Sequence, residues 1–467
     1  MSTDPNLFDV AVLGSGPGGY VAAIKAAQLG LNVAVIEKYS KFGGTCLHWG
    51  CIPTKALLFS AELYDKALKA KEFGVLCADV RFDFGLIKAR KDRIVRKLAT
   101  GTGFLMKKNR VTTFLGKGTI TAPGTIRVDG EKPAEVKSRN IVVATGSEAA
   151  LFPGLLADGK VILTNKEILD LEAVPRSLLV IGAGAVGIEF ASIFARFGAE
   201  VTVVEMLPRI LPLEDEDISE ELHKLLAKRK IQLMTGTRLE DLSVQDGQAA
   251  ATVQRPGGET RTLLAEKALI AVGRRAVVEG IGLEAVGVST TRGRIPVGGH
   301  METNVPGFFA IGDVVPTQQL AHVASHEGIL VMRHLAGEHT LPLNYDQVPN
   351  CTYCSPEVAS VGLSEEEARR RGHEVVTSRF PFAAIGKASI LGENDGFVKL
   401  VCEKKYNQIL GVHMIGPHVT ELVAAATAAI GLEATAEDVS HIIHAHPTVS
   451  EAIMEAAEAI YGAAIHI

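Results

Sequence analysis

The chain has 467 residues, of which 47% are hydrophobic, and a formal net charge of −5. This length predicts about three domains, each able to bury a core. Acidic and basic residues are interspersed, and the sequence contains no basic tract that would neutralise phosphates. We therefore expect neither nucleic acid nor a membrane surface as a partner.

Neither end of the sequence predicts an anchor or a leader. The longest apolar run near the C-terminus, Leu422–Leu432, is much shorter than the ~20 residues that cross a bilayer. The first six residues include an acid and no arginine, so they resemble neither a signal peptide nor a transit peptide. We expect a cytoplasmic location, where a working disulfide is more often catalytic than structural.

The first predicted element is a dinucleotide-binding unit. Residues 8–13 form a short apolar run, typical of a buried parallel strand. The turn Gly14-x-Gly16-x-x-Gly19 opens a helix, and a second strand ends at Glu37. The glycines would admit a pyrophosphate to the helix N-terminus, and the acid would bond a ribose hydroxyl. A tight turn without a ligand is the alternative.

Two cysteines follow in the segment Phe42–Lys55. Cys46 and Cys51 are five positions apart, and residues at that spacing in a regular helix point away from each other. A disulfide would need a local distortion, which Gly50 and Pro53 can supply. We interpret the pair as a redox disulfide, with two unrelated buried thiols as the alternative.

The dinucleotide unit recurs 168 positions later. Gly182, Gly184, Gly187 and Glu205 repeat the spacing of the first unit, which predicts two dinucleotide sites. A carboxylate accepts hydrogen bonds from the 2′-hydroxyl of NAD and repels the 2′-phosphate of NADP, so Glu205 favours NAD. Arg209 could reach a phosphate instead, and a solvated acid at a strand end is the other interpretation of Glu205.

Apolar strands that end in glycine turns close both units, at Thr145-Gly146 and at Gly273. After residue 344 strands alternate with helical stretches, and no nucleotide motif is present. We therefore expect an α/β fold with two Rossmann-like dinucleotide-binding domains and a C-terminal α+β domain. The predicted domains are residues 1–147, 148–275, 276–343 and 344–467.

Asp313 lies just after a short apolar strand in the third of these domains. Acids in that position commonly face a ligand. The alternative is an N-cap for the helix that follows.

Three histidines, His441, His444 and His446, lie close together near the end of the sequence. A histidine near a thiol is the natural general base for sulfur chemistry near pH 7, but spacing does not choose among the three. Glu451 could orient a histidine, or it could close a capping box with Thr448.

The other cysteines are expected to be structural. Cys77 and Cys402 are solitary, and we place both in cores. Cys351 and Cys354 form a Cys-x-x-Cys motif, but neither a second ligand pair for zinc nor a thioredoxin-type frame accompanies them. We predict no metal site.

Taken in order, these motifs resemble the pyridine nucleotide–disulfide oxidoreductases over about residues 8–460. Cys-Ile-Pro-Thr-Lys at 51–55 and His-Ala-His-Pro-Thr-x-Ser-Glu at 444–451 point to the branch that acts on dihydrolipoamide. The resemblance implies FAD in the first unit, NAD in the second, and a homodimer formed through the last domain. The implied FAD site comprises Gly14, Gly16, Gly19, Glu37, Thr45, Lys55, Thr145, Gly146 and Asp313. The implied NAD site comprises Gly182, Gly184, Gly187, Glu189, Glu205 and Gly273.

The resemblance also implies roles for the reactive residues. Cys46 would exchange with substrate and Cys51 would face the flavin. The partner subunit's His446 would be the base, oriented by Glu451. Lys55 would lie near the reactive flavin nitrogen and pair with Glu189, although without the resemblance both are interpreted as solvated helix charges.

The implied reaction oxidises dihydrolipoyl groups to the disulfide and reduces NAD+ to NADH. The substrate would be free lipoamide or a lipoyl domain on a 2-oxo acid dehydrogenase complex or a glycine cleavage system. Another disulfide reductase of the glutathione, mycothione or mercuric type is one alternative, and a non-catalytic docking subunit is another. The sequence departs from the family at His48-Trp49, where asparagine and valine are usual.

Overall fold

The computed structural model describes residues 7–152 and 155–467. The chain divides into two compact units. The first unit contains the chain up to Ala56, with Leu86–Ala150 and Arg274–Tyr345. The second contains Leu57–Gly85, Leu151–Gly273 and Asp346–Ile467.

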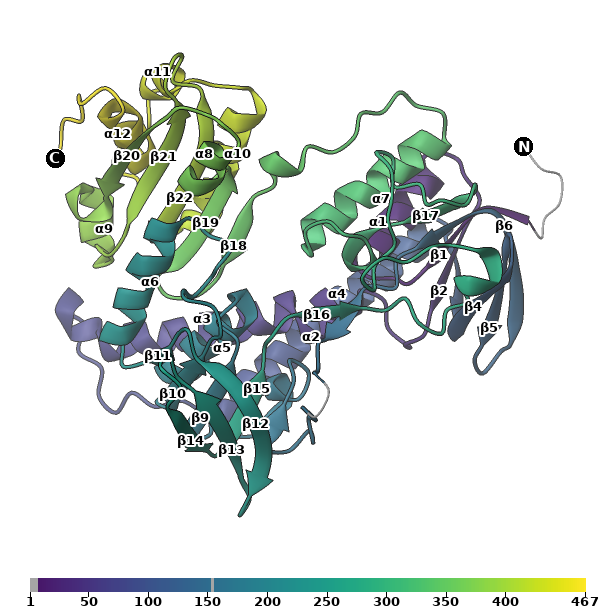
Figure 1. Cartoon of the computed structure of the whole chain (residues 1–467), viewed down its shortest axis with the longest axis horizontal. Coiled ribbons are helices and arrows are strands. Elements are labelled where there is room, and N and C mark those ends of the chain that lie inside the picture. The colour runs from purple at the N-terminus through teal and green to yellow at the C-terminus, as the bar shows by residue number, and fades with distance from the viewer. Residues whose placement is uncertain (1–6, 153–154) are drawn as a thin grey trace. The chain divides into compact units, whose positions relative to one another are not determined.

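A mixed sheet forms the centre of the first unit, in the order β3-β2-β1-β6-β5-β4, with β17 also paired to β6 (Figure 1). Pairing is parallel among β3, β2, β1 and β6 and between β6 and β17. The strands are β1 (Leu7–Leu13), β2 (Val33–Glu37), β3 (Thr112–Leu115), β4 (Lys117–Ala122), β5 (Thr125–Asp129), β6 (Ala134–Val143) and β17 (Phe308–Ala310). Because both faces of β1 are covered, its residues from Val10 to Leu13 are all buried and apolar.

Small residues bring two helices of the first unit together. Helices α1 (Pro17–Gln28) and α7 (Ala321–Leu335) pack against each other (Figure 1). A Cβ on Gly328 of α7 would meet the carbonyl oxygen of Gly18 at 2.8 Å, so the close approach depends on glycine. This packing places α7 beside the turn that opens α1.

The second unit repeats the core of the first. Its parallel sheet has the order β11-β10-β9-β15-β8. The strands and helices are β8 (Ile162–Leu163), β9 (Ser177–Ile181), α5 (Ala185–Arg196), β10 (Glu200–Val204), α6 (Glu216–Lys228), β11 (Gln232–Met234) and β15 (Lys267–Ile270). An antiparallel meander of β12 (Arg238–Gln245), β13 (Gln248–Gln254) and β14 (Thr260–Ala265) precedes β15.

An antiparallel sheet follows within the second unit, in the order β18-β19-β22-β21-β20 (Figure 1). Its strands are β18 (Asn350–Thr352), β19 (Glu357–Gly362), β20 (Val375–Pro381), β21 (Phe397–Glu403) and β22 (Ile409–Gly416). Helices α10 (Val419–Gly431), α11 (Ala436–Ser440) and α12 (Glu451–Ala459) lie on or beside it. Side chains alternate along β20, so Ser378 faces α12 while Arg379 points to the opposite side, toward α6.

The unit boundaries lie close to the domain boundaries expected from sequence. The chain changes unit between 150 and 151, 273 and 274, and 345 and 346. The sequence did not predict that Leu57–Gly85 belongs to the second unit, reached through the long helices α3 (Cys51–Leu68) and α4 (Phe84–Lys108). The division into four domains stays a prediction.

Candidate active site

The two cysteines of the predicted redox pair are joined by a disulfide at a break between two helices. Helix α2 (Gly44–Trp49) carries Cys46, and α3 begins at Cys51. Gly50 between them has φ −143° and ψ −111°, which is far from helical. The break brings the two Cα atoms to 4.7 Å, within the range that a disulfide requires.

The unusual residues beside the disulfide have structural partners. The Nε2 atom of His48 lies 2.9 Å from the carbonyl oxygen of Phe42, which ties helix α2 to the segment before it. Trp49 packs edge to face with Tyr39, with ring centroids 4.9 Å apart. These contacts give both departures from the family pattern a packing role.

The first glycine turn is closed by its acidic residue. One carboxylate oxygen of Glu37 accepts hydrogen bonds from the N–H and hydroxyl of Ser15, at 2.9 and 2.6 Å. The other accepts the N–H of Tyr39 at 2.9 Å. Gly14 donates its N–H to Ile36 at 2.8 Å, so the turn lies against the end of β2.

The second turn has the same arrangement 168 residues later. The carboxylate of Glu205 accepts the N–H groups of Ala183 and Leu207 at 2.7 and 2.8 Å. Gly182 donates its N–H to Val204 at 2.8 Å. The repeat found in the sequence is therefore also a repeat in three dimensions.

The glycines of each turn are required for different reasons. A Cβ on Gly14 or Gly182 would lie within 2.4 Å of a carbonyl oxygen, and one on Gly19 or Gly187 would lie 2.0 Å from another. The middle glycines, Gly16 and Gly184, have ordinary negative φ, and a Cβ there would meet no described atom within 4 Å. Neither backbone geometry nor packing in the described residues demands glycine at these two positions. A pyrophosphate that approaches the backbone closely would demand it, so the residues present fit a dinucleotide at each turn.

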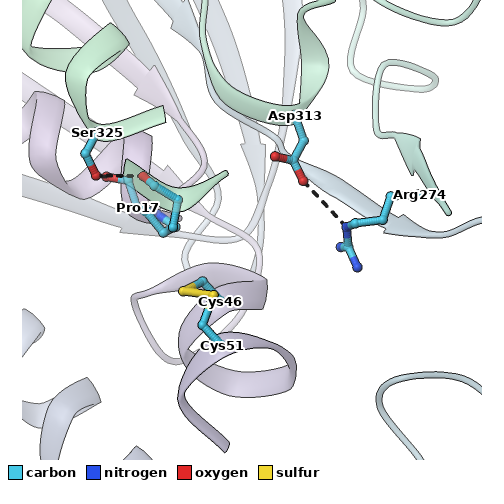
Figure 2. Close-up of a disulfide and its surroundings, with 7 residues drawn as sticks. Pro17, Cys46, Cys51, Arg274, Asp313 and Ser325 are labelled. Atoms are coloured by element: carbon cyan, nitrogen blue, oxygen red, sulfur yellow. Dashed lines mark hydrogen bonds and ion pairs between the residues drawn. A yellow bond between two sulfur atoms is a disulfide. The ribbon is translucent and has the colours of Figure 1, made fainter. Parts of the chain in front are cut away.

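Asp313 lies in a cluster that the sequence analysis did not find. It follows β17 in a short 3₁₀ turn, Gly312–Val314, and its carboxylate accepts the hydroxyl of Ser147. Arg274 places Nε 3.5 Å from the same carboxylate and 2.6 Å from the Ser147 hydroxyl. Figure 2 shows Asp313 and Arg274 pointing toward one another, in the same view as the disulfide. The alternative interpretation of Asp313 as an N-cap is wrong, because the helix that follows is preceded by Leu320.

A buried glutamate supports the turn that carries Asp313. Glu327 of α7 accepts the N–H of Gly312 at 2.6 Å and the hydroxyls of Thr317 and Tyr345 at 2.8 and 2.9 Å. Burial raises the pKa of Glu327, and the charge of Asp313 adds to this rise, although the three hydrogen bonds oppose it. The sequence offers no local signal for this contact, because Glu327 occupies an ordinary helical position.

The remaining FAD-site residues lie along the same unit. Thr45 of α2 donates its hydroxyl to the carbonyl of Ser147 at 3.4 Å, which links the disulfide helix to the Asp313 cluster. Thr145 donates to the carbonyl of Val277 at 2.6 Å. Gly146 has φ +71°, and Gly273, which belongs to the second unit and to the expected NAD site, has φ +120°. Side chains disfavour both conformations.

Lys55 and Glu189 lie on helices of different units. Lys55 is half-buried in α3. Glu189 is buried in α5, where its carboxylate accepts the N–H of Tyr353 at 3.0 Å. Their pairing with each other stays a prediction.

One of the three candidate histidines is paired with Glu451. The Nδ1 atom of His446 lies 2.9 Å from Oε1 of Glu451, whereas His444 contacts only a backbone carbonyl in the described contacts. The second oxygen of Glu451 accepts the N–H of Thr448 at 2.9 Å. The carboxylate thus makes the backbone contact of a capping box as well as the contact with His446. The full capping box with Thr448 does not form, because α12 begins at Glu451 itself, its N-cap is Ser450, and no described side chain caps it.

The remaining cysteines have varied surroundings. Cys402 is fully buried as expected, and burial raises its pKa to about 12. The placement of Cys77 in a core was wrong, because that residue is exposed. Cys354 is buried and donates its thiol to the carbonyl of Pro356 at 3.0 Å, and burial raises its pKa. Cys351 is partly exposed, and no disulfide joins it to Cys354 in the described chain.

Residues 7–152 and 155–467 contain neither a metal-binding cluster nor a membrane-spanning helix. No cluster of three or more histidine, cysteine, aspartate or glutamate side chains is arranged to hold a metal ion there. No helix in these ranges has both the length and the apolar character needed to span a membrane.

Comparison with known proteins places the whole chain in one family. Residues 8–328 match the pyridine nucleotide-disulphide oxidoreductases, and residues 348–457 match the dimerisation domain of that family. A dihydrolipoyl dehydrogenase of Bacillus subtilis is 49% identical, over 98% of this chain and 99% of that protein. A protein of the same name from Rhizobium etli is 43% identical, over 97% and 98%.

Solved structures agree with the sequence relatives. The crystal structure of LpdA from Mycobacterium tuberculosis superposes with a TM-score of 0.90 and 27% identity, covering 97% of this chain and 99% of that one. The matches confirm the expected resemblance. With the sheets described above, they also confirm the expected α/β fold class, with two Rossmann-like domains and an α+β domain.

Proposed function

Because the chain belongs to the pyridine nucleotide–disulphide oxidoreductase family, we propose that it is a dihydrolipoyl dehydrogenase with FAD and NAD as cofactors. It oxidises dihydrolipoyl groups to the cyclic disulfide and reduces NAD+ to NADH. The substrate is free lipoamide or a lipoyl group carried by a partner protein of a 2-oxo acid dehydrogenase complex or a glycine cleavage system.

The observation that carries this proposal is the position of the disulfide beside the first glycine turn. Gly43 donates its N–H to Ser15 at 2.9 Å, and a Cβ on Gly44 would lie 2.6 Å from the Cα of Gly16. The helix that carries Cys46 therefore starts directly against the turn that we assign to the FAD pyrophosphate. A structural disulfide would have no need of this neighbour.

The cysteines exchange electrons with the substrate by thiol–disulfide exchange. A substrate thiolate attacks Sγ of Cys46, the disulfide breaks, and Cys51 leaves as a thiolate. The second substrate thiolate then attacks the substrate sulfur of the mixed disulfide, which releases lipoamide and leaves Cys46 as a thiolate. The substrate loses two electrons, which now reside on the cysteine pair. When bound, FAD and NAD supply the onward transfer of that electron pair as a hydride.

His446 accepts the protons of the substrate thiols. Its Nδ1 hydrogen bond to Glu451 fixes the ring orientation and leaves Nε2 as the acceptor. Burial on its own raises the pKa of Glu451, but hydrogen bonds from His446 and Thr448 lower it overall, so the carboxylate stays charged beside the ring. We propose that the partner subunit's His446 serves each disulfide, which makes the enzyme a homodimer.

The cofactor residues follow from the two glycine turns. For FAD we assign Gly14, Gly16, Gly19, Glu37, Thr45, Lys55, Thr145, Gly146 and Asp313. For NAD we assign Gly182, Gly184, Gly187, Glu189, Glu205 and Gly273. A cytoplasmic location stays a prediction from the sequence.

Purification of the protein followed by two assays tests the proposal. We expect a yellow flavin spectrum, and NADH-dependent reduction of lipoamide that is at least about a hundredfold faster than reduction of glutathione disulfide, because each pocket of this family is matched to its own disulfide. Activity with glutathione disulfide and none with lipoamide would assign the protein to a different reductase. A protein with bound flavin that reduces neither substrate would support the docking-subunit alternative.

A further inference from the structure

A second glutamate–histidine pair lies one helical turn beyond the pair of His446 and Glu451. Glu455 follows Glu451 by four residues in α12, so the two carboxylates share one face of the helix. Oε1 of Glu455 lies 2.6 Å from Nδ1 of His466, and Oε2 accepts the N–H of Ile465 at 3.0 Å. Each glutamate therefore contacts one imidazole and one backbone N–H.

The two pairs differ in burial. The side chain of Glu455 is 1% exposed, whereas that of Glu451 is 19% exposed. A buried carboxylate is unfavourable unless it is paired and hydrogen-bonded, and like charges at this helical spacing repel each other. The contact with His466 satisfies the buried carboxylate and, when the ring is protonated, offsets its charge.

The charge of His466 also acts on the first pair. Burial raises the pKa of the Glu451 carboxyl, while hydrogen bonds from His446 and Thr448 and the charges of His446 and His466 lower it overall. The imidazole of His466, which lies beyond the end of α12 and contacts Glu455 one turn along the helix, thus takes part in setting the electrostatic environment of the carboxylate that contacts His446.

We propose that Glu455 and His466 are positioning residues for His446, which fix the first turns of α12 and set the electrostatic potential at the His446–Glu451 pair. The proposal rests on the proposed function, in which Nε2 of His446 accepts a thiol proton. A positive charge at His466 disfavours the protonated form of His446, and a negative charge at Glu455 favours it. The two residues therefore act with opposite sign on the pH at which His446 becomes a base.

Other charged groups near α12 have different orientations or partners. Helix α12 packs against α11, β20 and β21. On α11, Asp438 is bonded to Thr435 of its own capping box, and Glu437 is exposed. On β20 and β21, Arg379 and Lys399 pair with Asp217 on the face of the sheet opposite α12.

The pH dependence of kcat/KM for dihydrolipoamide, measured on the FAD-loaded enzyme, tests the proposal. This ratio falls on the acid side as the base of the free enzyme becomes protonated. In His466→Gln the acid limb should move to higher pH by roughly 0.2–0.5 units, the size expected when one exposed charge near a titrating group is removed. In Glu455→Gln it should move to lower pH, and His466→Lys should leave it at or below the wild-type position.

Salt and control variants separate an electrostatic role from a structural one. The shift in His466→Gln should shrink toward zero at 1 M salt, because that exposed charge is screened there, whereas the shift in Glu455→Gln should shrink less, because that carboxylate is buried. His326→Gln, an exposed histidine on α7, is the matched control and should leave the limb in place. Should Glu455→Gln fail to fold, the opposite behaviour of His466→Gln and His466→Lys decides the question.

Two results distinguish failure of the inference from failure of the proposed function. The proposed role of Glu455 and His466 is overturned if His446→Gln loses activity while the acid limbs of the pH profiles of His466→Gln and Glu455→Gln coincide with the wild-type limb at low salt. Shifts of equal direction in both variants would overturn it as well. If His446→Gln retains full activity, the assignment of His446 as the base fails instead.

Discussion

At the residue scale, Cys46 and Cys51 differ from the other cysteines in lying at a helix break beside a glycine turn. Cys51→Ser removes one sulfur of the pair and leaves the backbone unchanged. We expect dihydrolipoamide turnover to fall by at least about a thousandfold, because a serine hydroxyl cannot form the disulfide that carries the electrons. Turnover and flavin absorbance, measured together, check this.

The exposed Cys77 provides the matched control. Cys77→Ser should keep both flavin and turnover, since its thiol lies at the surface. Loss of FAD from Cys51→Ser, with turnover lost only as a consequence, would mean that the pair is structural.

Coenzyme choice also depends on single residues. Arg209, which could in principle reach a 2′-phosphate, lies 3.1 Å from Glu366 and 3.6 Å from Glu216. Glu205→Gln removes the charge that repels that phosphate, and we expect the preference for NAD over NADP in kcat/KM to fall about tenfold. Adding Glu366→Gln, which removes the closer of the two carboxylates that hold Arg209, should lower the preference by a further few-fold, because an exposed ion pair contributes at most about 1 kcal/mol.

Steady-state kinetics with both coenzymes measure this preference. Glu338→Gln, a surface carboxylate paired with Arg333, is the control and should change nothing. An unchanged preference in Glu205→Gln would show that the 2′ position is read by other residues.

The local motifs could be predicted because their partners are close in sequence. Each glycine turn and its acid lie within 25 residues of each other, and the cysteines are five apart. Ser147 and Arg274 could not be found in this way, since their contact joins residues 127 apart. No spacing rule identifies Ser147 or Arg274, although they directly follow Gly146 and Gly273, the glycines that close the two predicted units.

At the scale of elements, a polar row crosses the antiparallel sheet of the second unit. Neighbouring strands align Asn350 with Ser360, Ser360 with His413, and His413 with Lys399. Lys399 is 3% exposed and lies 2.9 Å from both Asp215 and Glu365 and 2.5 Å from Asp217. Asp215 also caps the start of α6, so this row attaches the second nucleotide-binding segment to the sheet.

Lys399→Met tests the importance of that attachment. The change leaves the buried carboxylate of Asp215 without its cation, which typically costs about 3–5 kcal/mol, so we expect a clearly lower Tm. Lys404→Met, which removes an exposed lysine paired with an exposed glutamate, is the control and should change Tm little. A Lys399→Met protein as stable as wild type would show that α6 is held by its apolar contacts alone.

The buried histidine of the same row predicts a pH dependence. Burial lowers the pKa of His413 below its ordinary value, although Asp215 and the bond to Leu363 oppose this. The folded state thus favours the neutral ring of His413. The resulting contribution to stability is fully present above the ordinary pKa of histidine, and it is lost as the pH falls through the pKa of His413 in the folded protein. Tm should therefore fall less steeply below about pH 6.5 in His413→Gln than in wild type. Equal slopes would contradict this.

Strand and helix identities were largely predictable, but their assembly was not. The apolar runs before each glycine turn became β1 and β9, because buried parallel strands have a simple pattern. The inclusion of Leu57–Gly85 in the second unit depends on packing between distant segments. Contacts such as that of Phe73 with Gly392, where a Cβ would lie 2.8 Å from the ring, leave no periodic signal in the sequence.

At the scale of the whole molecule, the proposed sites form one path of electrons. Dihydrolipoamide would reduce the cysteine pair, and FAD, when bound, would supply the transfer of the two electrons onward to NAD+. We assign the two cofactor sites to the repeated glycine turns and the role of the base to His446. Every step depends on reduction of Cys46 and Cys51 by the substrate.

Alkylation of thiols followed by mass spectrometry tests that step directly. The FAD-loaded protein is incubated with dihydrolipoamide without NAD+ and without oxygen, quenched in acid, and alkylated. We predict that Cys46 and Cys51 become labelled only after this incubation and stay unlabelled when NAD+ is added before the quench. If Cys46 and Cys51 are labelled no more after incubation with dihydrolipoamide than before it, the substrate does not reduce this disulfide, and the proposed electron path is contradicted.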